Sequence, residues 1–259
     1  MNRQPIYIGC AGWNLGREYW PAFATEGTHL QRYASRLNGV EINSSFYRPH
    51  RQQTYRRWAE SVPDALRFSV KVPKQITHVL KLKRCEQALD EFLAQCCGLQ
   101  DRLGCLLLQL PPSLAFDESV AVAFFNALRC RFAGHVVLEP RHESWVAAEP
   151  MLVQQRIAQV AVDPSRISTD AAPGGWPDVQ YWRLHGSPRI YYSAYQPPWL
   201  DELALKLQAA ADQGVATWCI FDNTASGAAL GNALALRALC PNGSMGNSTY
   251  VQSAPCHPR

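Results

Sequence analysis

The chain has 259 residues, of which 47% are hydrophobic and 18% are charged, and this ordinary globular usage excludes a largely disordered protein. Lys and Arg exceed Asp and Glu by 25 to 21, and a net charge of +4 is too small to indicate a nucleic-acid protein by itself. The nine cysteines lie far below the density of a disulfide scaffold, and no apolar run reaches membrane length. Because the N-terminus also lacks a secretion signal, we expect a cytoplasmic protein with no membrane partner.

Short runs rich in β-branched and aromatic residues recur along the chain, each bounded by turn residues. They predict eight strands, at residues 6–13, 40–47, 67–73, 104–111, 135–141, 156–163, 180–186 and 217–223. Helical periodicity between these runs predicts helices over residues 85–99, 119–130, 200–213 and 226–239. Pro and Gly residues at 163–179 instead predict an irregular connection between the sixth and seventh strands.

Eight strand-plus-connection units, spaced about 30 residues apart, are what a TIM (β/α)8 barrel requires. An open doubly wound sheet is the alternative, but it would more often carry a glycine-rich phosphate turn after its first strand, and residues 9–13 contain no such motif. We therefore predict a single TIM-barrel domain over residues 1–240. The remaining residues, 241–259, are predicted to form a poorly ordered C-terminal tail.

Side chains two residues apart on a strand point to the same side of the sheet. Phe68, Val70 and Val72 form an apolar face suited to packing under helices, so Ser69 and Lys71 should point into the barrel. The same alternation gives polar residues at the C-terminal ends of other strands: Glu41, Asn43, Gln109, Glu139, Arg141, Asp163, Arg183, His185, and either Asp222 or Asn223. In a barrel these ends meet at one mouth, where barrel enzymes have their active sites.

Buried charges have a second explanation, because a pair such as Glu41 with Lys71 can be a structural ion pair. Burying so many ionisable groups costs several kcal/mol for each unpaired ion, so a mouth open to a ligand is the preferred interpretation. Aromatic residues in the same loops suit stacking on a sugar ring or a nucleobase: Trp13, Phe46, Tyr47, Trp145, Tyr191, Tyr192, Tyr195 and Trp199.

Seven motifs in order carry a family resemblance: VEINSSFYR (40–48), FSVKVP (68–73), ITH (76–78), QLPPS (109–113), EPRHESW (139–145), YWRLHG (181–186) and FDNTA (221–225). With them the sequence resembles the YecE-like family, also called domain of unknown function 72. The resemblance implies a TIM barrel in the bacterial cytosol, but no reaction. Its motifs carry these candidate site residues: Glu41, Asn43, Tyr47, Lys71, His78, Gln109, Glu139, Arg141, His142, Trp145, Arg183, His185 and Asn223. The Asp222–Asn223 pair departs from the Asn–Asn form common in the family.

The first functional hypothesis is an enzyme that binds a polar, anionic or polyhydroxylated small molecule, such as a phosphorylated ligand, at the barrel mouth. Glu41 and Glu139 would be the acid/base pair, and His185 would move a proton near neutral pH. Other residues would bind the ligand: Lys71, Arg141 and Arg183 its anionic group, and Asn43 and Gln109 its hydrogen-bonding groups. In a more specific form of this hypothesis, the Lys71 amine forms a Schiff base with a carbonyl substrate.

Two alternatives stay open on the sequence alone. One is nucleic-acid binding or metal-assisted phosphodiester hydrolysis, for which ligand types are present: Glu41, Glu139, His142, Asp163, His185 and Asp222. No short motif such as H-E-x-x-H organises them, so we predict no metal residues and no cofactor, and a divalent metal is left open. The other alternative is a non-catalytic protein that binds a metabolite in the same pocket.

Overall fold

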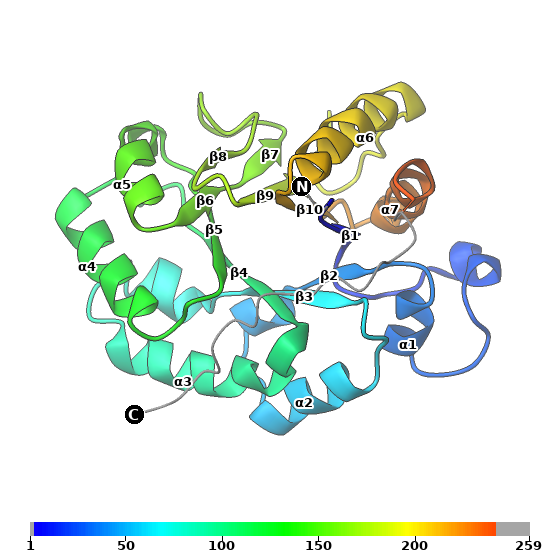
Figure 1. Ribbon diagram of the computed structural model, residues 1–259, viewed down its shortest axis with the longest axis horizontal. Coiled ribbons are helices and arrows are strands. Elements are labelled where there is room, and N and C mark those ends of the chain that lie inside the picture. The colour runs from blue at the N-terminus through cyan, green and yellow to red at the C-terminus, as the bar shows by residue number, and fades with distance from the viewer. Residues whose placement is uncertain (1–2, 242–259) are drawn as a thin grey trace.

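The computed structural model describes residues 3–241, and its ten strands form one sheet. Eight parallel strands follow one another around it, with the sixth in two parts (Figure 1): β1 (Ile6–Ala11), β2 (Gly39–Ile42), β3 (Arg67–Lys71), β4 (Leu103–Gln109), β5 (His135–Glu139), β6 (Ile157–Gln159) with β7 (Ala161–Asp163), β9 (Val179–Leu184) and β10 (Ala216–Phe221). The two-residue strand β8 (Gly174–Gly175) pairs antiparallel with β6 at the margin of the sheet.

The barrel closes at the expected sixth strand, which is interrupted at Val160. Before this residue β6 pairs with β5, and after it β7 pairs with β9. The Val160 N–H still donates to the carbonyl of Leu138 in β5, at 2.9 Å. The chain thus passes from one neighbour to the other without leaving the sheet, which confirms the predicted TIM-barrel fold.

Helices surround the sheet (Figure 1), and the described part of the chain has seven α-helices: α1 (His29–Ala34), α2 (Gln52–Glu60), α3 (Glu86–Cys96), α4 (Glu118–Arg129), α5 (Glu149–Gln154), α6 (Pro197–Asp212) and α7 (Ala228–Leu239). The four predicted helices correspond to α3, α4, α6 and α7. Helices α1, α2 and α5 were not predicted from the sequence. Helix α1 begins at a capping box formed by Thr28 and Gln31, and α4 begins where the Asp117 side chain accepts from the Val120 N–H. Within residues 3–241, an irregular segment and no α-helix joins β7 to β9, as predicted.

Two hydrophobic cores lie on opposite faces of the sheet. Phe68, Val70 and Val72 belong to the larger core, between the sheet and the helices, as the alternation along the strand predicted. The smaller core fills the barrel, where Trp218 packs against Tyr7 and Tyr181 at ring distances of 4.6 and 6.0 Å. These aromatic residues lie towards the N-terminal ends of their strands and fill that part of the barrel, so the polar residues are left for the opposite end.

No helix within residues 3–241 is long and apolar enough to cross a membrane. The tail predicted at 241–259 lies, apart from Pro241, outside the described residues.

Candidate functional site

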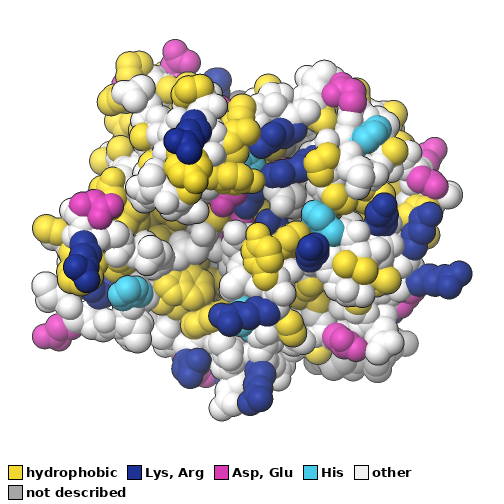
Figure 2. Space-filling model, turned by 180° about the vertical axis from the view of Figure 1, so that it is seen from behind, with side chains coloured by type: hydrophobic (Ala, Val, Ile, Leu, Met, Phe, Trp, Pro, Cys, Tyr) yellow, Lys and Arg dark blue, Asp and Glu magenta, His cyan; other side chains and the backbone are white. Residues whose placement is uncertain are grey.

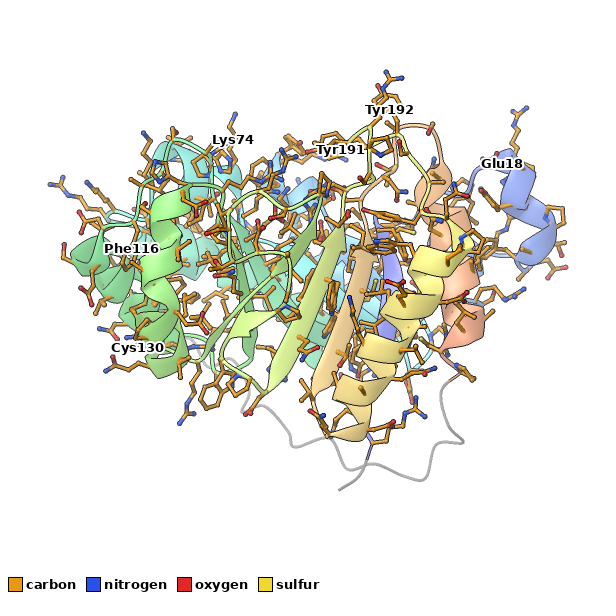
Figure 3. All side chains as sticks on the ribbon, turned by 90° about the horizontal axis from the view of Figure 1, so that it is seen from above. Glu18, Lys74, Phe116, Cys130, Tyr191 and Tyr192 are labelled. Carbon is orange, nitrogen blue, oxygen red and sulfur yellow. The ribbon has the colours of Figure 1, made fainter. Side chains whose placement is uncertain are left out.

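The C-terminal ends of the strands meet at one face of the barrel, which we call the mouth. Figure 3 shows that Lys74, Tyr191 and Tyr192, from the loops after β3 and β9, lie on this side of the molecule, whereas Cys130 lies on the other. Figure 2 looks onto the mouth, where Lys and Arg side chains gather around the middle with hydrophobic side chains between them. Inside the mouth, charged residues predicted from strand ends lie together, because Arg183 contacts both Glu41 and Glu139.

Arg183, from β9, is the centre of a buried ion-pair network inside the mouth. Its Nε and Nη2 donate to the two carboxylate oxygens of Glu41, at 3.0 and 2.8 Å. Its Nη1 donates to Glu139 at 3.2 Å, and its Nη2 lies 3.0 Å from Asp222. Burial alone would lower the pKa of Arg183, but the three carboxylates outweigh it and raise this pKa well above its usual value. One guanidinium thus neutralises groups from β2, β5 and the end of β10.

Glu139 is fully buried, and both of its carboxylate oxygens are occupied. Oε1 accepts from the Gln109 amide at 2.8 Å and from Arg141 Nε and Nη2 at 2.9 and 2.8 Å, while Oε2 accepts from Arg183. Burial would raise the pKa of this carboxyl, but Arg183, then His185 and Arg141, hold it well below its usual value. A permanently ionised carboxylate with so many donors is a poor general base, so these contacts favour a positioning role over the predicted acid/base role.

His185 and Asp222 form a second part of the network. The His185 Nδ1 lies 3.0 Å from Asp222 Oδ2, and its Nε2 lies 3.4 Å from both Arg183 Nη1 and Glu139 Oε1. Burial would raise the pKa of Asp222, but Arg183 and His185 lower it overall. Of Asp222 and Asn223, between which the alternation could not decide, Asp222 is therefore the one that joins the charged network.

Asn223, which the sequence analysis placed among the ligand-binding residues, instead faces α7. Its Nδ2 donates to the Ser193 carbonyl at 2.9 Å and to the Asn232 side chain at 3.0 Å. The alternation left these two neighbours undecided because the strand ends at Phe221 and the chain turns there.

Glu41 connects the network to a hollow beside the loops that follow β1 and β2. Its Oε2 accepts from the Tyr181 hydroxyl at 3.0 Å, in addition to Arg183. The hollow has a volume of about 480 Å³, and its lining includes Trp13, His29, Asn43 and Tyr47 besides Glu41. The Asn43 Oδ1 is buried and makes no hydrogen bond to any residue that the structure describes. Tyr47 is 75% exposed, so its ring is available to a ligand.

Lys71, at the end of β3, is the buried cation of the mouth that has no partner of its own. Only 4% of the residue is exposed, and its Nζ lies 4.3 Å from the ring centroid of Phe46. No hydrogen bond or ion pair joins this ammonium group to another residue within 3–241. Burial, and then Arg183, lower its pKa from 10.5 to about 8, although three carboxylates nearby act in the opposite direction.

Three further basic residues lie near Lys71 and complete what we call the basic cluster: Lys71, Lys74, His78 and Arg141. His78 packs edge-on against Phe46, with ring centroids 5.0 Å apart. Burial lowers the pKa of His78, and the charges of Lys71, Lys74 and Arg141 lower it further. Lys74 was not among the predicted site residues, because a lysine beyond a strand end looks like any solvated surface residue in the sequence.

Three predicted site residues have local structural contacts. Trp145 is buried in the outer core, and its indole N–H donates to the Leu114 carbonyl at 2.9 Å. The His142 Nδ1 accepts from the Ser144 N–H at the start of the short helix Glu143–Ala148. Asp163 ends β7 half-buried, and burial raises the pKa of its carboxyl. Trp145 thus lies away from the mouth, whereas Asp163 lies at its rim.

The acidic residues of the mouth are held apart from one another by Arg183. Among the residues that the structure describes, no three His, Cys, Asp or Glu side chains are grouped so as to hold a metal ion. The oxygens that would serve as ligands already accept hydrogen bonds from guanidinium groups. Three of the carboxylates that the sequence offered as metal ligands are therefore engaged by guanidinium groups, and no finding tests whether a divalent metal binds.

This arrangement defines a (β/α)8-barrel protein with a buried network of charged residues at the C-terminal ends of its strands. The family model described as "Protein of unknown function DUF72" matches residues 7–253. The chain belongs to this family, in agreement with the motifs of its sequence.

Curated relatives match part of the chain. The UPF0759 protein YecE of Escherichia coli K12 is 31% identical over 171 residues, which are 65% of this chain and 60% of that protein. The UPF0759 protein YunF of Bacillus subtilis 168 is 26% identical over 152 residues, which are 54% of this chain and 52% of that protein. The match therefore spans somewhat more than half of the length of these relatives.

Solved structures of the family have the same fold. A DUF72 family protein from Enterococcus faecalis V583 superposes with a TM-score of 0.74 at 20% identity, covering 93% of this chain and 97% of that one. A DUF72 family protein from Thermotoga maritima MSB8 gives 0.72 at 24% identity, covering 90% and 98%. At these identities the likeness shows the fold alone.

Proposed function

We propose that this protein is an enzyme that binds an anionic or polyhydroxylated small molecule at the barrel mouth and acts on it by acid/base chemistry. The observation that carries the proposal is Lys71, a buried ammonium group at the mouth with no ion-pair partner among residues 3–241. An unpaired buried charge destabilises a folded protein, and such charges are found mainly at sites where a ligand can pair with them.

The basic cluster supports an anionic group in the ligand. The charges of Lys71, Lys74 and Arg141 all act on His78, and the Glu139 carboxylate fixes the Arg141 guanidinium by two hydrogen bonds. A guanidinium held in this way is preorganised for a phosphate or a carboxylate. The hollow beside Glu41, with Trp13 and Tyr47 in its lining, supports a ring or polyhydroxyl portion in the ligand.

The proton-moving groups of the proposal differ in part from those predicted. Glu139 is assigned to positioning because its oxygens are occupied. Lys71, whose pKa of about 8 lies close to neutral pH, is the principal acid/base candidate, with His185 beside Asp222 as the second. Glu41 borders the hollow and stays a candidate for contact with the ligand.

Ligand-induced changes in melting temperature test the proposal. The probes are inorganic phosphate, sulfate, sugar phosphates and the matching uncharged sugars. We expect phosphate-bearing probes to stabilise the wild type, by about 2.7 kcal/mol at 100 times the dissociation constant. The Lys71→Met variant should lose this shift, and Lys206→Met, which removes an exposed lysine of α6, should keep it. No shift with any probe, or equal shifts in both variants, would refute the proposal.

Nucleic-acid binding is a second candidate, supported by exposed aromatic residues among basic ones at the mouth. Tyr191 and Tyr192 are about two-fifths exposed, and the Arg189 guanidinium lies 3.9 Å from the Tyr192 ring centroid. Such surfaces stack on unpaired bases. A single-stranded oligonucleotide should then bind with an affinity that falls steeply as salt rises, and salt-independent binding would exclude this candidate. Binding of a small ligand without any turnover would instead favour the non-catalytic alternative.

A further inference from the structure

Lys71 has the surroundings of a nucleophilic amine as well as those of a cation that binds anions. The carboxylates nearest to it are engaged by other donors: Glu41 by Arg183 and Tyr181, and Glu139 by Arg183, Arg141 and Gln109. Neither carboxylate accepts a hydrogen bond from the Lys71 ammonium group, and Arg183 adds a repelling positive charge. An amine in this position is deprotonated far more readily than an exposed lysine, and its neutral form attacks carbonyl carbon.

The groups next to Lys71 suit a substrate in which a carbonyl is close to an anionic group. Lys74 and Arg141 add positive charge near Lys71, and the charges of all three residues act on His78. The Nε and Nη2 of Arg141 are bound to Glu139, which leaves Nη1 without a hydrogen bond to any described residue. The face of the Phe46 ring, 4.3 Å from the Lys71 Nζ, excludes water on one side of the amine.

We infer that Lys71 forms an imine with the carbonyl group of an anionic substrate, either a 2-oxo acid or a phosphorylated sugar in its open-chain form. This inference rests on the proposed function and names the substrate class for that same site. The neutral Lys71 amine adds to the carbonyl carbon to give a carbinolamine. Loss of water, in which the former carbonyl oxygen leaves with the two amine hydrogens, then gives the C=N bond. Atoms and electrons balance without an oxidant or a reductant.

Reductive trapping tests the inference directly. The full-length protein is incubated separately with pyruvate, glyoxylate, dihydroxyacetone phosphate and glyceraldehyde 3-phosphate, and sodium borohydride then reduces any imine to a stable secondary amine. Mass spectrometry of the intact protein and of its peptides locates the adduct. We expect at least one probe to give a single adduct on Lys71. Its yield should rise as the pH passes through about 8, where half of the amine is neutral.

Two variants provide the controls for the trapping experiment. Lys71→Arg keeps a cation but removes the amine, so the adduct should fall at least tenfold, and circular dichroism checks that this variant is folded. Lys206→Arg changes an exposed lysine on the outer helix α6 and should give the wild-type yield. A Lys71 that reacts no faster than Lys206 with every probe, or an unchanged adduct in Lys71→Arg, overturns the imine.

The thermal shifts of the same samples separate the two proposals. If phosphate or the phosphorylated probes stabilise the protein but nothing is trapped on Lys71, the anion-binding function stands and only the imine is wrong. If no anionic or polyhydroxylated probe stabilises the protein and nothing is trapped, both proposals are wrong.

Discussion

Lys71 and Arg183 are two cations of the same mouth in opposite situations. The planar guanidinium of Arg183 can donate to three carboxylates at once, and its pKa is raised. Lys71 is left without a partner in the described part of the chain, and its pKa is lowered. The alternation along β3 and β9 predicted that both side chains point into the barrel. The alternation could not predict that Arg183 pairs with the carboxylates and Lys71 does not, because pairing depends on distances between strands that are remote in sequence.

Replacing Lys71 by Met should stabilise the protein at neutral pH. The unfolded chain keeps the lysine proton up to its ordinary pKa of 10.5, whereas the folded protein releases it at about 8. Folding is therefore penalised below pH 8, and the penalty disappears as the pH rises to 10.5. The gain in Lys71→Met is at most about 3 kcal/mol at pH 7, or several degrees in melting temperature.

Urea unfolding of Lys71→Met at pH 7 and at pH 10 checks this sign, with the exposed Lys206→Met as the matched control. A variant that is less stable than the wild type at pH 7 would show that Lys71 has a stabilising structural role instead.

The strand ends are the elements that sequence patterns describe least well. The run at 40–47 predicted a strand, but β2 ends at Ile42 and Ser44–Phe46 form a short 3-10 helix. Likewise β3 ends at Lys71, and Gln75–Val79 form a π-helical turn that carries His78. Hydrophobic alternation continues beyond the sheet because the first residues of each loop still cover the core. The patterns therefore found the site residues on β2 and β3 but not the turns that orient Asn43, Tyr47 and His78.

The pairing of β1 with β2 depends on a close approach at Gly9, which is opposite Gly39. A Cβ atom on Gly9 would lie 1.8 Å from the Gly39 carbonyl oxygen and 2.4 Å from the Tyr33 hydroxyl. That hydroxyl donates to the Gly39 carbonyl and accepts from the Cys10 N–H, both at 2.8 Å. We expect Gly9→Ala to cost about 3 kcal/mol or more, because the overlap involves backbone atoms that cannot move aside.

Chemical denaturation of Gly9→Ala measures this cost. Gly174→Ala is the comparison, since its added Cβ would meet other atoms only at 3.4 Å or beyond and should change stability little. Equal stabilities for the two variants would contradict the close approach of β1 and β2.

At the scale of the whole molecule, the repeated spacing of strand signals was sufficient to predict the barrel, and the motifs identified its family. The break at Val160 was not predictable, because residues 157–163 form one uninterrupted, mostly apolar run without a Gly or Pro. The segment is divided in two because its first part pairs with β5 and its second part pairs with β9. The curvature of the barrel is thus a property of the assembled sheet and is not encoded in any short stretch of sequence.

Arg183 links four of the barrel strands or their ends through one side chain, so Arg183→Met should destabilise the whole barrel. Glu139 and Asp222 would lose the charge that now lowers their pKa values, and burial would raise those values. Carboxyl groups with a raised pKa favour the folded state at low pH and destabilise it as the pH rises. We expect a loss of about 3–5 kcal/mol at pH 7, which becomes smaller as the pH falls towards 4.

Unfolding curves of Arg183→Met between pH 4 and 8 provide the measurement. Arg131→Met, which removes a surface ion pair with Asp90, should have a small and nearly constant effect. A loss for Arg183→Met that does not vary with pH would mean that Glu139 and Asp222 do not depend on the guanidinium.

The placement of the two hydrophobic cores on opposite faces of one sheet has a consequence for how this protein can change over generations. Phe68 and Val70 pack against the surrounding helices and hold them on the sheet. Ser69 and Lys71, their immediate neighbours in the chain, face the interior of the barrel. Successive residues of β3 are therefore selected for different properties: one set for packing against the helices, and the other for its role inside the barrel. A lineage can acquire a new specificity on one set of positions while the other set keeps the helices packed on the sheet.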